Sequence, residues 1–410
     1  MLPNIQRDKL FLASCTSLLV TSLSFGIRAG LLTTWSSEFS LTHEQIGIIT
    51  STAFWGFPLA IVIGGLVVDI IGMKKLLVGA FLFHMVGIFL TVVAHGFWPL
   101  FISTLLIGMG NGTVEAACNP LVASLYTTNK TTKLNHFHLW FPGGIVIGTL
   151  IVHFLGQTAL APDHATTLIT NWRFLVGLMV IPTLVYGFLF LRLTLPVTER
   201  VASGVSSAQM YKSLLKPLFL IMIVLMLGTA ITELFTEQWI DVLLKNVTDN
   251  ALLLLTIETG IMVIGRAFAG PIVHRLSPSG VLLGSAVLAA TGLYLLGHTT
   301  GNTLFAGAII FGVGVCYFWP TMLGFVSENL PETGAVGLNF MGGAGMFAVS
   351  LYLIFMGGYY DRLQQSKSPA AAGQDIINVT FIIPVVLIVA FACLFVYKRS
   401  QRKVMMQPAT

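Results

Sequence analysis

The chain has 410 residues, of which 55% are hydrophobic and only 9% are Asp, Glu, Lys or Arg, and its formal net charge is +5. Because soluble domains carry about a quarter of their residues as charged side chains, this composition excludes a soluble enzyme and a soluble nucleic-acid binder. The apolar runs are long and continuous, whereas the strands of membrane barrels alternate apolar and polar residues. We therefore predict an all-α integral membrane protein.

Runs of about 20 apolar residues, the length that crosses a bilayer, occur twelve times along the chain. In order, we predict membrane helices at 10–36, 45–68, 75–95, 98–125, 135–157, 172–195, 215–244, 250–274, 280–298, 302–327, 337–358 and 376–397. A polar connector separates the sixth run from the seventh. The predicted architecture is two six-helix bundles, residues 1–196 and 215–410, joined by a cytoplasmic linker at residues 197–214.

The basic residues predict the orientation in the membrane. Most of the 21 Lys and Arg side chains fall in loops on the same side as both termini, and such loops face the cytoplasm in membrane proteins. We expect both termini in the cytoplasm and the chain in a bacterial inner membrane. The four cysteines form no CxxC pair, so neither a disulfide framework nor a metal site is expected.

A short motif follows the second predicted helix and consists of Gly65, Asp69, Gly72, Lys74 and Lys75. It resembles the loop between the second and third spans of the major facilitator superfamily. The resemblance implies a monomer whose two bundles rock around a central site, with gating roles for the glycines, Asp69 and Lys74. We add Arg266, which lies at the corresponding place in the second half, to this gating set. A purely structural role is the alternative for Asp69, Lys74 and Arg266.

Within that superfamily the chain most resembles the fucose and glucose–proton symporters. The shared features are Gly108-x-Gly110, Glu115 and Asn119-Pro120 on the fourth span, Leu134-Asn135 with His138 on the fifth, and Glu233 with Trp239 on the seventh. The resemblance implies that Glu115 is a proton-linked or substrate-contacting acid and that Asn119 contacts substrate. The first span departs from the branch, because it carries Arg28 where the sugar symporters carry an acid. In carrying an arginine on this span, the chain resembles other branches of the superfamily, which handle sugar acids and organic anions.

Arg28 is a charge in the middle of an apolar helix, which is costly unless it faces a cavity or a partner. Its guanidinium can hold a carboxylate through two parallel hydrogen bonds. Two interpretations stay open: Arg28 clamps an anionic substrate, or it forms an ion pair with Glu115. Both expect Arg28 and Glu115 to face one central chamber.

Asn111, Glu115 and Asn119 follow one another at intervals of four residues, so they lie on one face of the fourth helix. Three hydrogen-bonding groups in a row within a lipid-embedded helix favour a polar cavity over a permanently ionised salt bridge. We predict that Glu115 changes its protonation as the cavity alternates its opening.

The seventh and eighth helices carry further acids. Glu233 shares a helix face with Glu237, and repulsion between them favours protonation of one. Trp239 can stack on a sugar ring, although a tryptophan near a helix end is also typical of the membrane interface. Glu258 is another candidate proton site, or it pairs with Arg266.

The predicted site combines these residues with others on the fifth, tenth and eleventh helices, and His84 is expected only to pack in the core. The proton-coupling residues are Glu115, Glu233 and Glu258. The substrate-binding residues are Arg28, Asn111, Asn119, Asn135, His138, Gln238, Trp239, Trp319 and Asn339.

No P-loop, nucleophile elbow or HExxH motif occurs in the chain, so we expect neither ATP hydrolysis nor enzyme activity, and no cofactor. The energy source is then an ion gradient, most economically protons. We predict a secondary active transporter that couples protons to the symport of a small polar solute, a sugar or a sugar acid, by alternating access. The alternatives are a proton-antiport exporter of drugs, siderophores or other organic anions, and a membrane receptor or scaffold that does not transport.

Overall fold

The computed structural model describes residues 4–159, 171–237 and 251–405. Every regular element in these ranges is a helix. The prediction of an all-α membrane protein is therefore confirmed for the described parts of the chain.

The first half begins with four long helices, α1 (Asn4–Glu38), α2 (His43–Ile71), α3 (Met73–Val92) and α4 (Phe97–Leu125). The fifth and sixth predicted spans are each divided in two, into α5 (Lys130–His138) with α6 (Trp140–Ala159), and α7 (Trp172–Gly177) with α8 (Val180–Arg192). The break between α5 and α6 lies just before Pro142. A proline has no backbone N–H, so the hydrogen bond that would close this turn is missing.

The second half follows two short helices, α9 (Glu199–Ala202) and α10 (Ser207–Ser213). Its first helix, α11 (Pro217–Ala230), continues into a π-helical turn, η3 (Ile231–Phe235). The remaining elements are α13 (Ala251–Ala267), α14 (Ala269–His298), α15 (Thr303–Val315), α16 (Phe318–Asn329), the 3-10 turn η4 (Pro331–Thr333), α17 (Gly334–Gln364) and α18 (Pro369–Met405).

The number of membrane helices differs from the prediction. Within the described residues, eleven helical segments are long and apolar enough to cross a membrane, not twelve. The eighth predicted span, 250–274, corresponds to α13, of which 17 residues are described, and to the start of α14. The single element α14 covers both the end of this span and the ninth span. It contains a kink at Ser277, a non-helical residue with φ 63° that precedes Pro278.

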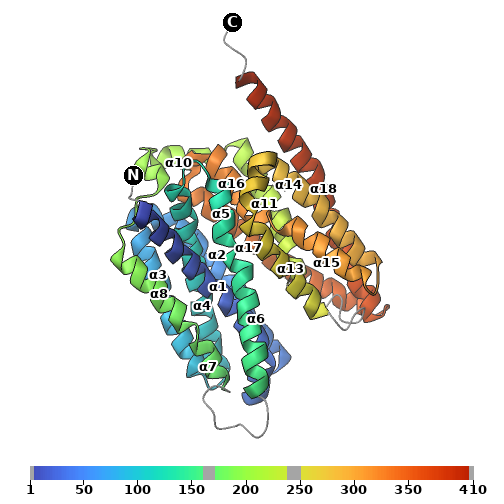
Figure 1. Cartoon of the computed structure of the whole chain (residues 1–410). Coiled ribbons are helices and arrows are strands. Elements are labelled where there is room, and N and C mark those ends of the chain that lie inside the picture. Colours follow the sequence, from blue (N-terminus) through green and yellow to red (C-terminus); the bar gives the residue numbers. More distant parts are fainter. Residues whose placement is uncertain (1–3, 160–170, 238–250, 406–410) are drawn as a thin grey trace.

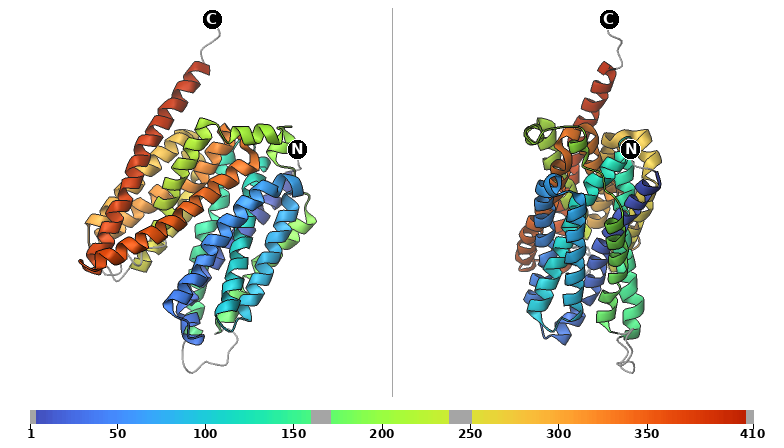
Figure 2. Two further views of the ribbon diagram at one scale, coloured as in Figure 1. Left: turned by 180° about the vertical axis from the view of Figure 1, so that it is seen from behind. Right: turned by 90° about the vertical axis from the view of Figure 1, so that its left-hand side faces the viewer.

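The two halves meet on one side of the molecule and diverge towards the other (Figure 1). α1 begins and α18 ends on the side where the halves meet, and α10 lies there as well. The view from behind shows the first half, in blue to green, and the second half, in yellow to red, as separate bundles (Figure 2). We call the side with both chain ends the terminal side, and the other the opposite side.

The halves touch mainly where α2 packs on α17, α5 on α16 and α6 on α13. Glycine makes two of these approaches close. A Cβ on Gly65 of α2 would lie 2.5 Å from the Cβ of Asn339 in α17, and one on Gly324 of α16 would lie 2.4 Å from the hydroxyl oxygen of Thr131 in α5. Small residues at such positions let membrane helices approach closely.

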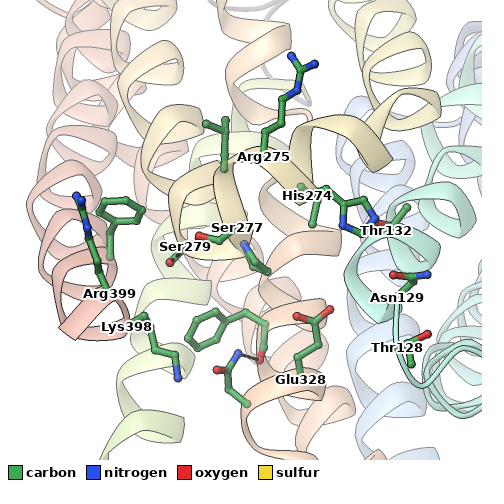
Figure 3. A pocket seen from close by; sticks show the side chains of 16 residues that line it. Thr128, Asn129, Thr132, His274, Arg275, Ser277, Ser279, Glu328, Lys398 and Arg399 are labelled. Atoms are coloured by element: carbon green, nitrogen blue, oxygen red, sulfur yellow. Dashed lines mark hydrogen bonds between the residues drawn. The ribbon is translucent and has the colours of Figure 1, made fainter. Parts of the chain in front are cut away.

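A large hollow of about 580 Å³ opens on the terminal side (Figure 3). Its wall is formed by the α4–α5 connection, the chain around Ser277 in α14, the end of α16, and α18. Glu328 and Lys398 are among the charged side chains that line it. None of the predicted site residues that the structure describes lines this hollow.

Candidate functional site

A small cavity lies between the two halves, and side chains from both of them form its wall. Its volume is about 20 Å³, room for about one water molecule. The lining residues are Phe57 of α2, Glu115 of α4, His138 of α5, Phe141 of α6, Glu233 and Leu234 of η3, Arg266 of α13, Trp319 of α16 and Met346 of α17. We call this the central cavity. It contains two carboxylates and one guanidinium.

Arg266 is the hydrogen-bonding centre of this cavity and is 1% exposed. Its Nη2 donates to Oε1 of Glu233 at 2.8 Å. Its Nε donates to the backbone carbonyl of Cys316 at 2.7 Å, and its Nη1 to that of His138 at 2.9 Å. Arg266 therefore joins its own half to the first half at the cavity wall. The expected ion pair between Arg266 and Glu258 is not formed, and Glu233 takes that place.

Two prolines explain why these carbonyls are free. In an α-helix each carbonyl bonds the N–H four residues later, and a proline at that position has no N–H. Pro142 follows His138 by four residues, and Pro320 follows Cys316 by four. The arginine supplies the N–H groups that the two helices lack.

Glu115, Asn119 and His138 form a chain of hydrogen bonds beside Arg266. The amide nitrogen of Asn119 donates to Oε2 of Glu115 at 3.2 Å. The amide oxygen of Asn119 lies 2.9 Å from Nε2 of His138, and because an amide oxygen only accepts, the imidazole donates. The fourth helix thus brings Glu115 and Asn119 together as the spacing predicts.

Asn111, the third member of the predicted stripe, is placed in a different network. Its amide oxygen lies 2.9 Å from Nε2 of His84, and its amide nitrogen donates to the Ser24 hydroxyl at 3.0 Å. Nδ1 of His84 lies 2.9 Å from the Tyr186 hydroxyl. This network joins four helices inside the first half, so Asn111 does not line the central cavity, and His84 is buried but hydrogen-bonded through both ring nitrogens.

Arg28 and Glu115 do not share a chamber in this conformation. Arg28 lines a second cavity, inside the first half, while Glu115 lines the central one. The guanidinium of Arg28 stacks over the ring of Phe25, 4.9 Å from its centroid. The expected ion pair between Arg28 and Glu115 is therefore absent.

The acids of the second half have few partners. Oε2 of Glu233 and both carboxylate oxygens of Glu258 are buried and have no hydrogen-bond partner. Glu258 is 0% exposed and Glu237 is 8% exposed, so both acids are buried. Gln238 and Trp239, predicted to contact substrate, lie outside the described residues.

Asn135 and Asn339 join the halves. The amide nitrogen of Asn339 in α17 donates to the backbone carbonyl of Ala116 in α4 at 3.0 Å. The amide nitrogen of Asn135 donates to the Thr321 hydroxyl at 3.3 Å. Neither asparagine lines the central cavity, whereas Trp319 does, and its indole N–H has no acceptor.

Of the predicted gating residues, Asp69 connects the first half to the chain between the halves, whereas Lys74 bonds within the first half. Oδ2 of Asp69 accepts from Nε of Arg200 at 2.6 Å, and its Oδ1 accepts from the Thr198 hydroxyl at 2.5 Å. Lys74 donates to the backbone carbonyl of Leu191 at 2.9 Å. Gly72 has φ 86°, a backbone conformation that favours glycine.

Two further contacts close the terminal side, and the sequence did not single them out. Nζ of Lys130 lies 2.7 Å from the Glu199 carboxylate and 3.0 Å from the backbone carbonyl of Ser327, to which it donates. The backbone N–H of Thr131 donates to Oε1 of Glu328 at 2.9 Å. Only the position of these residues in loops between the predicted spans could have suggested them.

Two helical bundles with a charged cavity between them are the arrangement of a membrane transporter, and this is the class of protein that the fold and the cavity indicate. The family described as Major Facilitator Superfamily matches residues 14–351, and the chain belongs to this superfamily. Myo-inositol transporter 1 of Saccharomyces cerevisiae is 31% identical over 149 residues, which are 35% of this chain and 23% of that protein. The chain thus matches less than a quarter of that relative's length.

Two longer matches complete the comparison. A probable sugar efflux transporter of Haemophilus influenzae is 21% identical over 319 residues, 76% of each chain. The structure of the fucose:proton symporter FucP of E. coli superposes with a TM-score of 0.70 at 16% identity, covering 92% of this chain and 98% of that one. At this identity the structural likeness shows the fold.

Proposed function

We propose that the protein is a secondary active transporter that couples protons to the symport of a small polar solute, a sugar or a sugar acid. The central cavity carries the proposal, because it is formed by both halves and places Glu115 and Glu233 around one guanidinium, that of Arg266. Two buried carboxylates and one guanidinium leave one negative charge uncompensated. A buried charge without a partner is costly, so binding of one proton makes the cavity neutral.

The orientation completes the cycle. Basic loops favour a cytoplasmic location for the terminal side, and in that orientation the halves are closed towards the cytoplasm and diverge towards the outside. Substrate and proton enter from outside, and rocking of the halves then separates the contacts of the terminal side. Coupling requires that substrate and proton bind the two conformations with different affinities.

The residues have separate roles in this proposal. Glu115 takes up the proton, because within the described part of the chain its only side-chain donor is the neutral Asn119. Glu233 and Glu258 are further proton sites. Trp319 offers an unpartnered indole N–H to a substrate hydroxyl, and the cavity widens to admit the solute. We place the protein, as a monomer, in a bacterial inner membrane.

The proposal can be tested with purified protein in proteoliposomes that contain a pH-sensitive dye in the lumen. Adding D-glucose, L-fucose or D-gluconate outside should acidify the lumen if one of them is carried with protons. The variant Glu115→Gln should abolish accumulation driven by a proton gradient and preserve substrate exchange between the two sides. Glu332→Gln, at an exposed ion pair with Lys216, is the matched control.

Export by proton antiport is the second candidate, favoured by the similarity to the probable sugar efflux transporter. It predicts the opposite sign in the same assay, because adding a substrate outside vesicles would then drive protons out. Accumulation that persists in Glu115→Gln would show that Glu115 is not the coupling acid. No flux and no binding for any of the three solutes would contradict the proposed function for sugars and sugar acids.

A further inference from the structure

A second cavity lies inside the first half, towards the opposite side. Arg28 and Trp35 line it from the last third of α1, with Thr91 of α3, Thr104 of α4 and Met179 among the other residues of its wall. Its volume is about 20 Å³, which accommodates one small polar group. We call it the Arg28 cavity.

Two side chains of this cavity have N–H groups without an acceptor among the residues that the structure describes. The indole nitrogen of Trp35 is buried without a hydrogen-bond partner, and the residue is 1% exposed. Arg28 forms no ion pair with any carboxylate among residues 4–159, 171–237 and 251–405. Its contact with the face of Phe25 leaves the edge of the guanidinium free for hydrogen bonds. A buried donor without an acceptor is costly, so the indole N–H of Trp35 indicates a missing partner. The half-buried guanidinium of Arg28 lines the same cavity.

The other polar groups of the cavity already have acceptors for their hydrogens. The hydroxyl of Ser24 donates to the carbonyl of Thr21, that of Thr91 to a carbonyl of its own helix, and that of Thr104 likewise. No carboxylate of the described ranges lines the cavity. The cavity therefore presents one positive charge and one indole N–H, a combination that suits an anion.

We propose that the Arg28 cavity binds the carboxylate group of an anionic substrate, a sugar acid rather than a neutral sugar. The guanidinium holds the two carboxylate oxygens and the indole N–H of Trp35 donates to one of them. This inference rests on the proposed function and narrows its substrate class. A neutral sugar leaves Arg28 without a counter-ion and gains no charge-assisted hydrogen bond.

The Arg28 cavity is an outer binding site on the path of the substrate to the central cavity. Phe25 lies between the two, because its ring contacts the guanidinium of Arg28 and also lies 5.8 Å from the ring of Phe141, which lines the central cavity. In the orientation given above, the opposite side faces outside. A sugar acid that arrives from outside meets Arg28 first and passes the rings of Phe25 and Phe141 to reach Glu115.

Binding to the purified full chain tests this assignment by isothermal titration with D-gluconate, D-glucuronate and D-glucose, each at constant chloride. We expect both acids to bind and glucose to bind at least about tenfold more weakly, as the loss of hydrogen bonds to a charged group implies. Trp35→Phe, which keeps a ring and removes the N–H, should weaken binding of the acids about tenfold, and Arg28→Gln about 100-fold.

Trp172→Phe is the matched control. Trp172 packs edge-on against Trp35 with centroids 5.9 Å apart, but its indole N–H already donates to Glu38. Its substitution should leave gluconate affinity unchanged. Melting temperatures show whether each variant is folded, and the comparison of ligands on the unsubstituted protein decides the matter even where a variant unfolds.

Three results would overturn the assignment. One is gluconate affinity that Arg28→Gln does not change. Another is binding of chloride itself in a titration with chloride, together with no binding of either acid. That result would show a site for an inorganic anion. The third is proton-coupled flux of glucose without binding of the acids. That result would contradict carboxylate binding in the Arg28 cavity and leave the proposed transport function intact. Absence of flux and of binding for all three solutes would contradict both the carboxylate site and the proposed transport function.

Discussion

Arg266 of the second half donates a hydrogen bond to the carbonyl of His138 in the first half, at 2.9 Å, and that carbonyl is free because Pro142 lacks an N–H. The same rule applies at Ala116, which Pro120 leaves without its helical partner and which accepts from Asn339 of the other half at 3.0 Å. These two contacts between the halves thus use carbonyls that no helix needs. They can form and break during rocking without unwinding a helical turn.

Replacing Pro142 tests this relationship. Pro142→Ala restores an N–H that competes with Arg266 for the carbonyl of His138, so we expect a smaller population of the conformation that diverges on the opposite side. Spin labels at His95→Cys and Thr300→Cys, both exposed near that side, should show a shift to shorter distances. Cys393, the exposed native cysteine, is replaced first.

Pro182→Ala is the control for this experiment. The carbonyl four residues before Pro182, that of Leu178, already accepts from the N–H of Ile181, and no contact between the described parts of the two halves uses it. The distance distribution should not change. An equal shift in both proline variants would contradict a specific role for Pro142.

Arg266 and Glu233 should depend on each other for stability. Both side chains are almost fully buried, and removing one partner of such a pair leaves a charge without compensation, at a cost of about 3–5 kcal/mol. Arg266→Gln should lower the free energy of unfolding by about this amount, and adding Glu233→Gln should recover part of it. Thermal melting of the single and double variants measures the effect, with the exposed Arg362→Gln as control. Additive losses in the double variant would contradict the coupling.

Parts of the site follow from helical spacing, and parts do not. The interval of four residues places Glu115 and Asn119 together, and the superfamily signature leads to the right fold. Partner choice could not be predicted, because Arg266 lies about two helical turns from Glu258 in sequence but bonds Glu233 on another helix. Arg28 shares no chamber with Glu115 because the rotation of α1 about its axis is set by packing, which hydropathy does not report. The pairs His138 with Pro142 and Cys316 with Pro320 were readable, since a proline always frees the carbonyl four residues earlier.

Tyr186 should matter for stability and not for transport. Its hydroxyl bonds His84, which bonds Asn111, and none of these three side chains lines the central cavity or the Arg28 cavity. Tyr186→Phe removes one buried hydrogen bond and should lower the free energy of unfolding by about 1 kcal/mol. Transport at saturating substrate should stay unchanged in proteoliposomes. A loss of coupling in this variant would mean that the network belongs to the transport site.

Glu258 provides the last test, of proton binding away from the central cavity. Both oxygens of this carboxylate are buried without a partner, and the side chain packs against α15, where a Cβ on Gly312 would lie 3.4 Å from Cγ of Glu258. An ionised carboxylate in such a place is costly, so we expect Glu258 to carry a proton in this conformation. Glu258→Gln then replaces one neutral group by another of similar shape. The melting temperature should change little, whereas the number of protons carried per substrate should fall if Glu258 releases its proton to the cytoplasm after rocking. Glu332→Gln again serves as the exposed control, and a stoichiometry that stays the same in Glu258→Gln would leave Glu115 and Glu233 as the remaining proton sites.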